Sequence, residues 1–121
     1  MKILHFEYSD FFRQIIHDMS SRLGFDYYGT SRGDDFFKLI SKHDADVIIT
    51  GMELSDMKAE ELISNIKDSK YTDTPVIILT SLEIENIHKR LKELTFNDLI
   101  LKENLTVDSF KKCIGRFDRN D

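Results

Sequence analysis

The fold is decided by one stretch of sequence, Thr74-Pro75-Val76-Ile77-Ile78-Leu79-Thr80-Ser81. A proline introduces four consecutive apolar residues, three of them β-branched, and two hydroxyl side chains close the run. Runs of this kind are typical of strands that are buried on both faces, as in parallel sheets covered by helices. The stretch therefore predicts a central strand over residues 76–80.

Working outward from this strand, shorter apolar runs predict four more strands, and the segments between them predict helices. The strands are expected over residues 3–7, 25–30, 45–50 and 98–101. The helices are expected over residues 10–23, 34–42, 59–66, 82–94 and 107–117. A strand followed by a helix, five times over, predicts an α/β fold with a doubly wound, five-stranded parallel sheet.

Capping residues support these helices. Ser9, Ser81 and Thr106 each precede a helical pattern and are good N-cap residues, and Gly24 is a suitable C-terminal stop. Four apolar residues of the fourth helix are expected to face the core: Ile84, Ile87, Leu91 and Leu94. In a sheet of this kind the functional crevice lies at the carboxyl ends of the strands. Those ends are expected at residues 7–9, 50–52, 80–81 and 102–103.

Length and composition limit the classes of function. The chain has 121 residues with 17 basic and 22 acidic side chains, so one domain over residues 1–121 with a formal charge of −5 is expected. A mildly acidic balance argues against binding nucleic acid, and the single Cys excludes an internal disulfide. No apolar run is long enough to span a bilayer, and the N-terminus lacks a signal-peptide layout. We therefore expect a cytoplasmic domain.

Taken together, the strand ends resemble a response-regulator receiver domain of the CheY-like type. Residues 3–9 resemble the family's first strand and its acidic pair, and residues 45–57 its third strand and following loop. Residues 74–81 resemble the fourth strand with its Thr/Ser switch, and residues 97–102 the fifth strand with its Lys. The resemblance covers the whole chain. It implies the CheY-like, flavodoxin-like fold and a signalling module of bacterial two-component systems and phosphorelays, not an enzyme.

The sequence departs from the family pattern where the family's chemistry resides. The resemblance implies that the phosphoacceptor Asp would stand at Gly51, and that the second acid of the Mg²⁺-binding pair would stand at Tyr8. The family's Lys is usually followed by Pro, but here Glu103 follows it, and Leu99 replaces the aromatic switch residue. Glu7, Tyr8, Thr80 and Lys102 are then a remnant of a phosphorylation pocket, in which only Thr80 and Lys102 match outright.

Charge at this predicted pocket argues against a bound cation. A receiver with three carboxylates and one Lys carries two surplus negative charges, which a divalent ion neutralises. Here Glu7 and Lys102 balance each other, and Gly51 has no side chain to accept a phosphoryl group. We therefore expect a direct Glu7–Lys102 ion pair, with Tyr8 filling part of the vacated space, and neither a metal nor another cofactor.

Other readings of the same residues stay open. Glu7 and Lys102 are about equally well interpreted as relics without a present role or as a working part of the pocket. Thr80 is equally well interpreted as a capping hydroxyl or as a switch residue. Glu53 and Asp56 lie in the loop after Gly51, and each is a candidate substitute phosphoacceptor, although a turn residue and a cap are the simpler readings. A phosphorelay receiver that uses Glu53 or Asp56 is thus the alternative function. A flavodoxin-like cofactor carrier is a third and weaker option.

A partner surface is predicted from the basic residues of the last two helices. It comprises residues of the fourth helix, fifth strand and fifth helix: Lys89, Arg90, Leu99, Lys111 and Arg116. A mixed, solvated surface would have the same composition. The receiver family commonly uses this region for partner contacts or dimers, so we expect protein partners, including a homodimer. The first reading is a pseudo-receiver acting through phosphorylation-independent contacts, alone or as one domain of a longer regulator.

Overall fold

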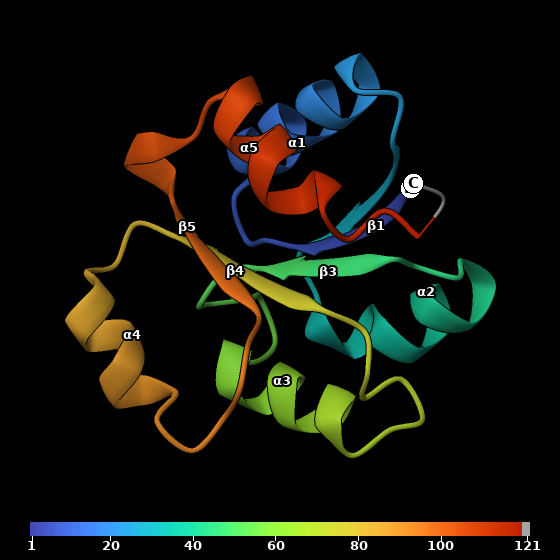
Figure 1. Ribbon diagram of the computed structural model, residues 1–121. Coiled ribbons are helices and arrows are strands. Elements are labelled where there is room, and N and C mark those ends of the chain that lie inside the picture. The colour runs from blue at the N-terminus through green and yellow to red at the C-terminus, as the bar shows by residue number, and fades with distance from the viewer. Residues whose placement is uncertain (120–121) are drawn as a thin grey trace.

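Five parallel strands form one sheet, and five helices cover its two faces, as the computed structural model shows (Figure 1). The structure describes residues 1–119, so residues 120 and 121 of the predicted domain lie outside the described residues. The strands are β1 (Lys2–Phe6), β2 (Asp26–Thr30), β3 (Val47–Thr50), β4 (Val76–Thr80) and β5 (Asp98–Leu101). Their order across the sheet is β2-β1-β3-β4-β5, with every neighbouring pair parallel. The predicted α/β class is confirmed.

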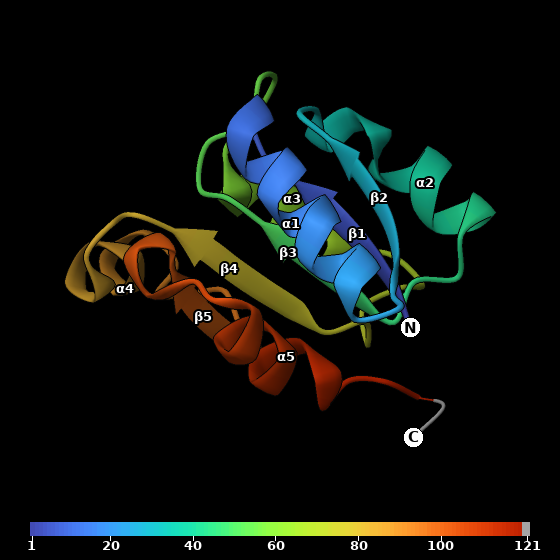
Figure 2. The ribbon, with the colours of Figure 1, turned by 90° about the horizontal axis from the view of Figure 1, so that it is seen from above.

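The helices are α1 (Asp10–Arg22), α2 (Phe36–Lys42), α3 (Ala59–Lys67), α4 (Ile84–Arg90) and α5 (Val107–Gly115). Short 3₁₀ turns, η1 (Gly33–Asp35) and η2 (Lys102–Asn104), precede α2 and α5. Figure 1 shows α1 and α5 on one side of the sheet and α2, α3 and α4 on the other. Figure 2, seen from above, shows the strands running in one direction, so that their carboxyl ends form one edge.

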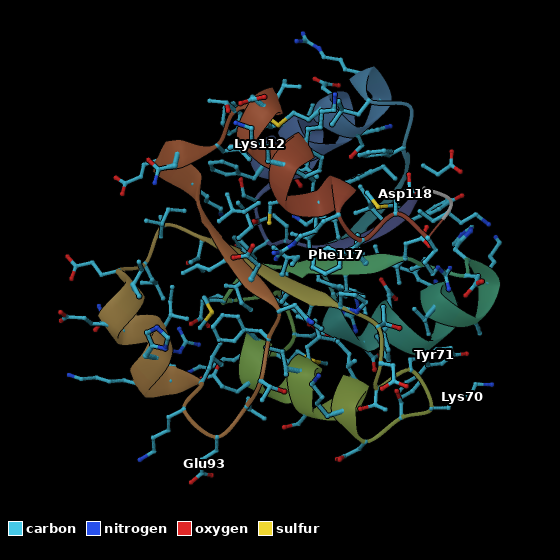
Figure 3. The ribbon with its side chains drawn as sticks, viewed as in Figure 1. Lys70, Tyr71, Glu93, Lys112, Phe117 and Asp118 are labelled. Carbon is cyan, nitrogen blue, oxygen red and sulfur yellow. The ribbon has the colours of Figure 1, made fainter. Side chains whose placement is uncertain are left out.

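The core consists of two apolar layers, one on each face of the sheet, because alternate strand residues point to opposite faces. Leu4 and Phe6 of β1 pack toward α2, α3 and α4, whereas Ile3 packs toward α1 and α5. All five residues of β4 are at most 4% exposed, as expected of the central strand. Phe117, labelled in Figure 3, packs against the α1 and α5 layer from beyond the end of α5.

Three of the predicted helix ends are confirmed. The Ser9 hydroxyl accepts a hydrogen bond from the Phe12 amide, and Thr106 forms a capping box with Ser109. Gly24 has a φ of +74°, a left-handed conformation that favours glycine after a helix.

The prediction for the fourth helix was wrong at both ends. The helix begins at Ile84 with Glu83 at the N-cap position, so Ser81 does not cap it, and it ends at Arg90. Ile84 is 47% exposed and does not face the core, whereas Ile87 and Leu91 are buried. Thr80 accounts for the change at the start, because its hydroxyl accepts the Leu82 amide and holds the chain in a turn.

Three further features of the described residues concern membrane spans, metal ligands and the single cysteine. No helix within residues 1–119 has the length and apolar content required to cross a membrane. Over the same residues, no three His, Cys, Asp or Glu side chains are grouped closely enough to hold a metal ion. Half-buried Cys113 donates to Asp98 across 3.4 Å, and burial raises the pKa of this thiol to about 12.

Candidate functional site

A pocket of about 300 Å³ opens at the carboxyl edge of the sheet, where the predicted crevice lies. It is lined by residues at or just after the carboxyl ends of β1, β3, β4 and β5, together with one residue of α4: Glu7, Tyr8, Ser9, Gly51, Met52, Glu53, Leu79, Thr80, Ser81, Leu82, Arg90 and Lys102. The parallel sheet therefore brings together Glu7, Gly51, Thr80 and Lys102, as the strand ends predict. It also brings Arg90 to the pocket, which the sequence interpretation placed on a partner surface.

Glu7 and Lys102 form a direct ion pair on the pocket floor. Lys102 Nζ lies 3.0 Å from Glu7 Oε1, and the two side chains are 17% and 4% exposed. The Oε1 atom lacks a well-aligned hydrogen bond among the described residues, so the contact is mainly electrostatic. The second carboxylate oxygen accepts the Ser9 amide at 3.1 Å. The predicted pairing is confirmed.

Neighbouring side chains hold both members of this pair. The Lys102 ammonium lies 4.1 Å from the centre of the Phe12 ring, a cation–π contact. Arg13 donates to the backbone carbonyls of Glu7 at 2.6 Å and of Tyr8 at 3.1 Å, and it also pairs with Asp10. The first turns of α1 thus fix the end of β1. The sequence analysis missed Phe12 and Arg13, since nothing in their spacing indicates a contact with Lys102 or with β1.

Gly51 lies against Glu7. A Cβ atom at this position would stand 3.4 Å from Glu7 Oε1 and 3.6 Å from the other carboxylate oxygen. These are ordinary contact distances, so the backbone would accept a side chain here at the cost of crowding the carboxylate.

The prediction that Tyr8 fills vacated space was wrong. Tyr8 is 66% exposed, and it lines the pocket at the rim and not at the floor. Arg13 donates to the Tyr8 carbonyl, and because the Tyr8 side chain is mostly exposed, it does not fill the pocket beside the Glu7–Lys102 pair.

Arg90 forms the wall of the pocket on the side of α4. It donates to both carboxylate oxygens of Glu60 at 3.1 and 2.8 Å, and it pairs with Glu53 at 2.8 Å. The hydrogen bond to Glu60 raises the pKa of Arg90. Burial would raise the pKa of Glu60, but the hydrogen bond from Arg90, together with a backbone hydrogen bond and the charges of Arg90 and Lys58, lowers it below its usual value. Arg90 therefore ties α4 to the start of α3 and to the loop after β3.

The two candidate acceptors in that loop are engaged elsewhere. Glu53 contacts Arg90, as described above. Asp56 accepts the amides of Gly33 at 2.8 Å and Asp34 at 3.0 Å, which ties its loop to the corner after β2. Burial would raise the pKa of Asp56, but the hydrogen bonds from Asp34 and Gly33 hold it below its usual range. Asp56 acts as a cap for a neighbouring loop.

A buried histidine lies on β1, two residues before Glu7. His5 is fully buried, and its Nδ1 lies 2.7 Å from the Tyr27 hydroxyl, whereas Nε2 has no partner among the described side chains. Burial, with smaller contributions from Lys102 and Arg13, lowers the pKa of His5 to about 3. Burial likewise raises the pKa of Tyr27. Neither group forms part of the pocket lining.

The predicted partner surface is only partly available. Arg90 is directed to Glu53 and Glu60, and Arg116 pairs with Asp98 at 2.5 Å. Leu99 is half-buried against the α2, α3 and α4 layer. Lys89 and Lys111 are exposed, on helices that lie on opposite faces of the sheet in Figure 1.

The fold and the pocket point to a known protein family. Residues 3–112 match the response regulator receiver domain, and the chain therefore belongs to this family. Curated relatives include the chemotaxis protein CheY homologue of Campylobacter jejuni, 32% identical over 84 residues, a match that covers 67% of this chain. The same match covers 65% of that relative, so the chain spans slightly less than two thirds of its length.

Solved structures confirm the fold at low sequence identity. The receiver domain of the sensor histidine kinase PA1611 from Pseudomonas aeruginosa, described with a magnesium ion coordinated in its active site cleft, has a TM-score of 0.86 at 17% identity. The match covers 96% of this chain and 95% of that one. Chemotaxis protein CheY4 of Vibrio cholerae has a TM-score of 0.84 at 20% identity, covering 96% and 97%.

The pocket residues of this chain do not fit a magnesium ion. Mg²⁺ requires near-octahedral oxygen ligands and is usually held by carboxylates. The pocket lining contains two carboxylates, Glu7 and Glu53, and each already contacts a cationic side chain. A bound Mg²⁺ would have to displace Lys102 from its 3.0 Å contact, and we derive no chemistry through such an ion.

Proposed function

We propose that this receiver domain is a pseudo-receiver, which signals in a two-component pathway through protein–protein contacts that do not depend on phosphorylation. The proposal includes a cytoplasmic location and no enzymatic activity of its own. One observation supports it: Lys102 Nζ lies 3.0 Å from the Glu7 carboxylate, and this carboxylate lies beside Gly51. The pocket is therefore close to neutral and lacks a nucleophile at Gly51.

The chemistry of phosphoryl transfer supports this proposal. Transfer of a phosphoryl group requires an oxygen nucleophile at the receiving position and positive charge to stabilise the transferring group. Gly51 supplies no oxygen from a side chain, and Lys102 is already compensated by Glu7. The engagement of Glu53 with Arg90, and of Asp56 with two amides, weighs against either residue as a substitute acceptor. A pocket of this kind favours one lasting conformation over a switch between two.

The partner surface on α4, β5 and α5 remains part of this proposal, with fewer exposed basic residues than the sequence predicts. Arg90 and Arg116 of that set are paired with carboxylates, whereas Lys89 and Lys111 are exposed and form no ion pair within residues 1–119. A homodimer through this region would change mass with protein concentration, which light scattering measures directly.

Intact mass spectrometry after incubation with acetyl phosphate and Mg²⁺ tests the function. We expect no stoichiometric phosphate adduct, in a reaction where an Asp-containing receiver domain serves as the positive control. A stoichiometric adduct would contradict the proposal. The acceptor would then be identified by whichever of the variants Glu53→Gln and Asp56→Asn no longer forms the adduct.

A further inference from the structure

The exposed apolar side chains of this domain gather at one edge. Four large hydrophobic side chains are exposed among the described residues, and three of them, Tyr8, Phe11 and Ile84, lie at the carboxyl edge of the sheet. Tyr8 and Phe11 are each 66% exposed, Ile84 is 47% exposed, and the fourth, Phe37, lies on α2. Scattered single apolar residues are normal on a surface, but a local group often marks a binding site.

Tyr8 and Ile84 border two adjoining hollows, and Phe11 contacts the Phe12 ring, which packs against Lys102 of the first hollow. Tyr8 lines the pocket already described, and Ile84 lines a second hollow between the start of α4 and the end of β5. Ser81 and Leu82 line both, so the two hollows adjoin. Figure 2 shows the first turns of α1 and α4 at the same end of the sheet, which is where these residues lie. We call this surface the carboxyl-edge face.

The charge of the carboxyl-edge face is negative. Its exposed charged residues are acidic: Asp10, Glu83, Glu85 and Glu103. The basic residues nearest to it, Arg13, Arg90 and Lys102, are 24%, 24% and 17% exposed. Each is paired with a carboxylate: Arg13 with Asp10, Arg90 with Glu53 and Glu60, and Lys102 with Glu7. A partner that approaches this face therefore meets aromatic and aliphatic side chains surrounded by carboxylates.

We propose that the carboxyl-edge face binds a basic, amphipathic helical segment of a partner protein. Its apolar residues would contact Tyr8, Phe11 and Ile84, and its Lys or Arg residues would face Glu83, Glu85 and Glu103. Exposed aromatic side chains are common anchors at interfaces, and opposite charge accelerates association and selects the partner. An acidic segment or a nucleic acid would be repelled. The inference rests on the proposed function only in that it takes the partner to be a protein.

The chain offers one competing occupant of its own. A groove between the end of α1 and α5 contains four basic side chains, Arg22, Lys111, Lys112 and Arg116, with Leu23 and Phe25 beside them. A second copy could in principle bring this groove to the carboxyl-edge face, head to tail. The groove also contains Asp108, which pairs with Lys112, and Asp118, so its surplus of positive charge is small. We therefore favour a separate, more basic partner.

Titration of the ¹⁵N-labelled domain with a synthetic peptide tests the inference. The probe is an amphipathic helix of about 14 Leu and Lys residues, and its twin with Glu in place of Lys is the control. We expect saturable shifts at residues 8–12 and 81–85 with the Lys peptide alone. Phe11→Ser should weaken binding about tenfold, the loss typical of an interface anchor. Glu103→Lys should weaken it about fivefold at low salt.

Matched variants locate the effect. Phe37→Ser removes the exposed aromatic side chain on α2, and Asp73→Lys reverses a charge at the opposite edge of the sheet, before β4; neither should alter binding. Equal losses with Phe37→Ser and Phe11→Ser, shifts spread over the whole surface, or binding of the Glu peptide would contradict the inference. A concentration-dependent dimer that buries Phe11 would also overturn it. A phosphate adduct in the mass experiment would overturn the proposed function and leave these titrations unaffected.

Discussion

Glu7 is nearly inaccessible to solvent, and among the described residues the one cation paired with its carboxylate is Lys102 at 3.0 Å. A buried ion pair is costly to form, yet removal of one partner is far more costly, because the other charge is left uncompensated. Lys102 thus has two consequences for the site. It stabilises the carboxylate of Glu7, and it leaves this carboxylate already paired with a cation.

Lys102→Met tests this coupling. The variant should lose about 3 kcal/mol of unfolding free energy, because the Glu7 carboxylate remains buried without its cation. The double variant Glu7→Gln with Lys102→Met should recover a large part of that loss. Urea unfolding measures both. Lys112→Met, which breaks an exposed pair with Asp108, is the matched control and should cost less than about 0.5 kcal/mol. Equal losses at Lys102 and Lys112 would contradict the account.

Gly51→Asp places a second carboxylate within contact distance of Glu7. Since Lys102 balances only one of the two charges, we expect lower stability and little binding of Mg²⁺ by the single variant. Adding Tyr8→Asp supplies a third carboxylate, and Mg²⁺ binding should appear only then. Calorimetric titration with MgCl₂ compares the variants. Strong binding by Gly51→Asp alone would mean that Lys102 yields its place easily.

His5 makes stability depend on pH. Its pKa is about 3 in the folded state and 6.5 when unperturbed, so the unfolded chain binds an extra proton between these values. Stability should therefore fall as pH decreases below 6.5, by at most about 1.4 kcal/mol per pH unit. His5→Gln does not titrate and should flatten the profile between pH 6.5 and 5, whereas exposed His88→Gln should not. Parallel profiles for the two variants would refute this assignment.

Among the elements, α4 differs most from expectation. The sequence predicts a helix over residues 82–94, but α4 spans Ile84–Arg90. The apolar spacing is correct as far as Ile87 and Leu91, which are buried, but it carries no information about the turn that the Thr80 hydroxyl stabilises. A short helix depends on its tertiary contacts, and Arg90 supplies three of them, to Glu53, Glu60 and the Met52 carbonyl.

Arg90→Met should loosen α4. We expect a loss of about 1 kcal/mol in unfolding free energy, and faster amide exchange over residues 84–90 and in the loop after β3. Hydrogen exchange followed by mass spectrometry resolves both segments. Lys89→Met is the matched control, because Lys89 is exposed on the same helix. Unchanged exchange in the loop after β3 would show that Arg90 does not hold it.

For the whole molecule, the strand and helix pattern was sufficient to predict the fold. The buried strands β3 and β4 are apolar runs that end in Thr, and β1 is apolar apart from Lys2 and His5. Such runs alternate with amphipathic helices, so a parallel sheet follows. The same logic predicted that Glu7, Gly51, Thr80 and Lys102 meet at one edge, since they follow different strands. The pattern could not predict that the Tyr8 side chain is exposed, or that Arg90 contacts Glu53 and Glu60. The exposure of the Tyr8 side chain has no signal in the strand and helix pattern, and the Arg90–Glu60 contact joins residues 30 apart in the sequence.

The proposed function requires that the Glu7–Lys102 pair closes the pocket to a metal ion and a phosphoryl group. The most direct measurement is a ¹⁵N–¹H spectrum of the unmodified domain before and after addition of MgCl₂ and beryllofluoride, a phosphoryl mimic. We predict no saturable shift of the Glu7, Gly51, Thr80 or Lys102 amides at millimolar Mg²⁺. Saturable shifts of these four amides would show that the site still accepts both groups, and would contradict the account.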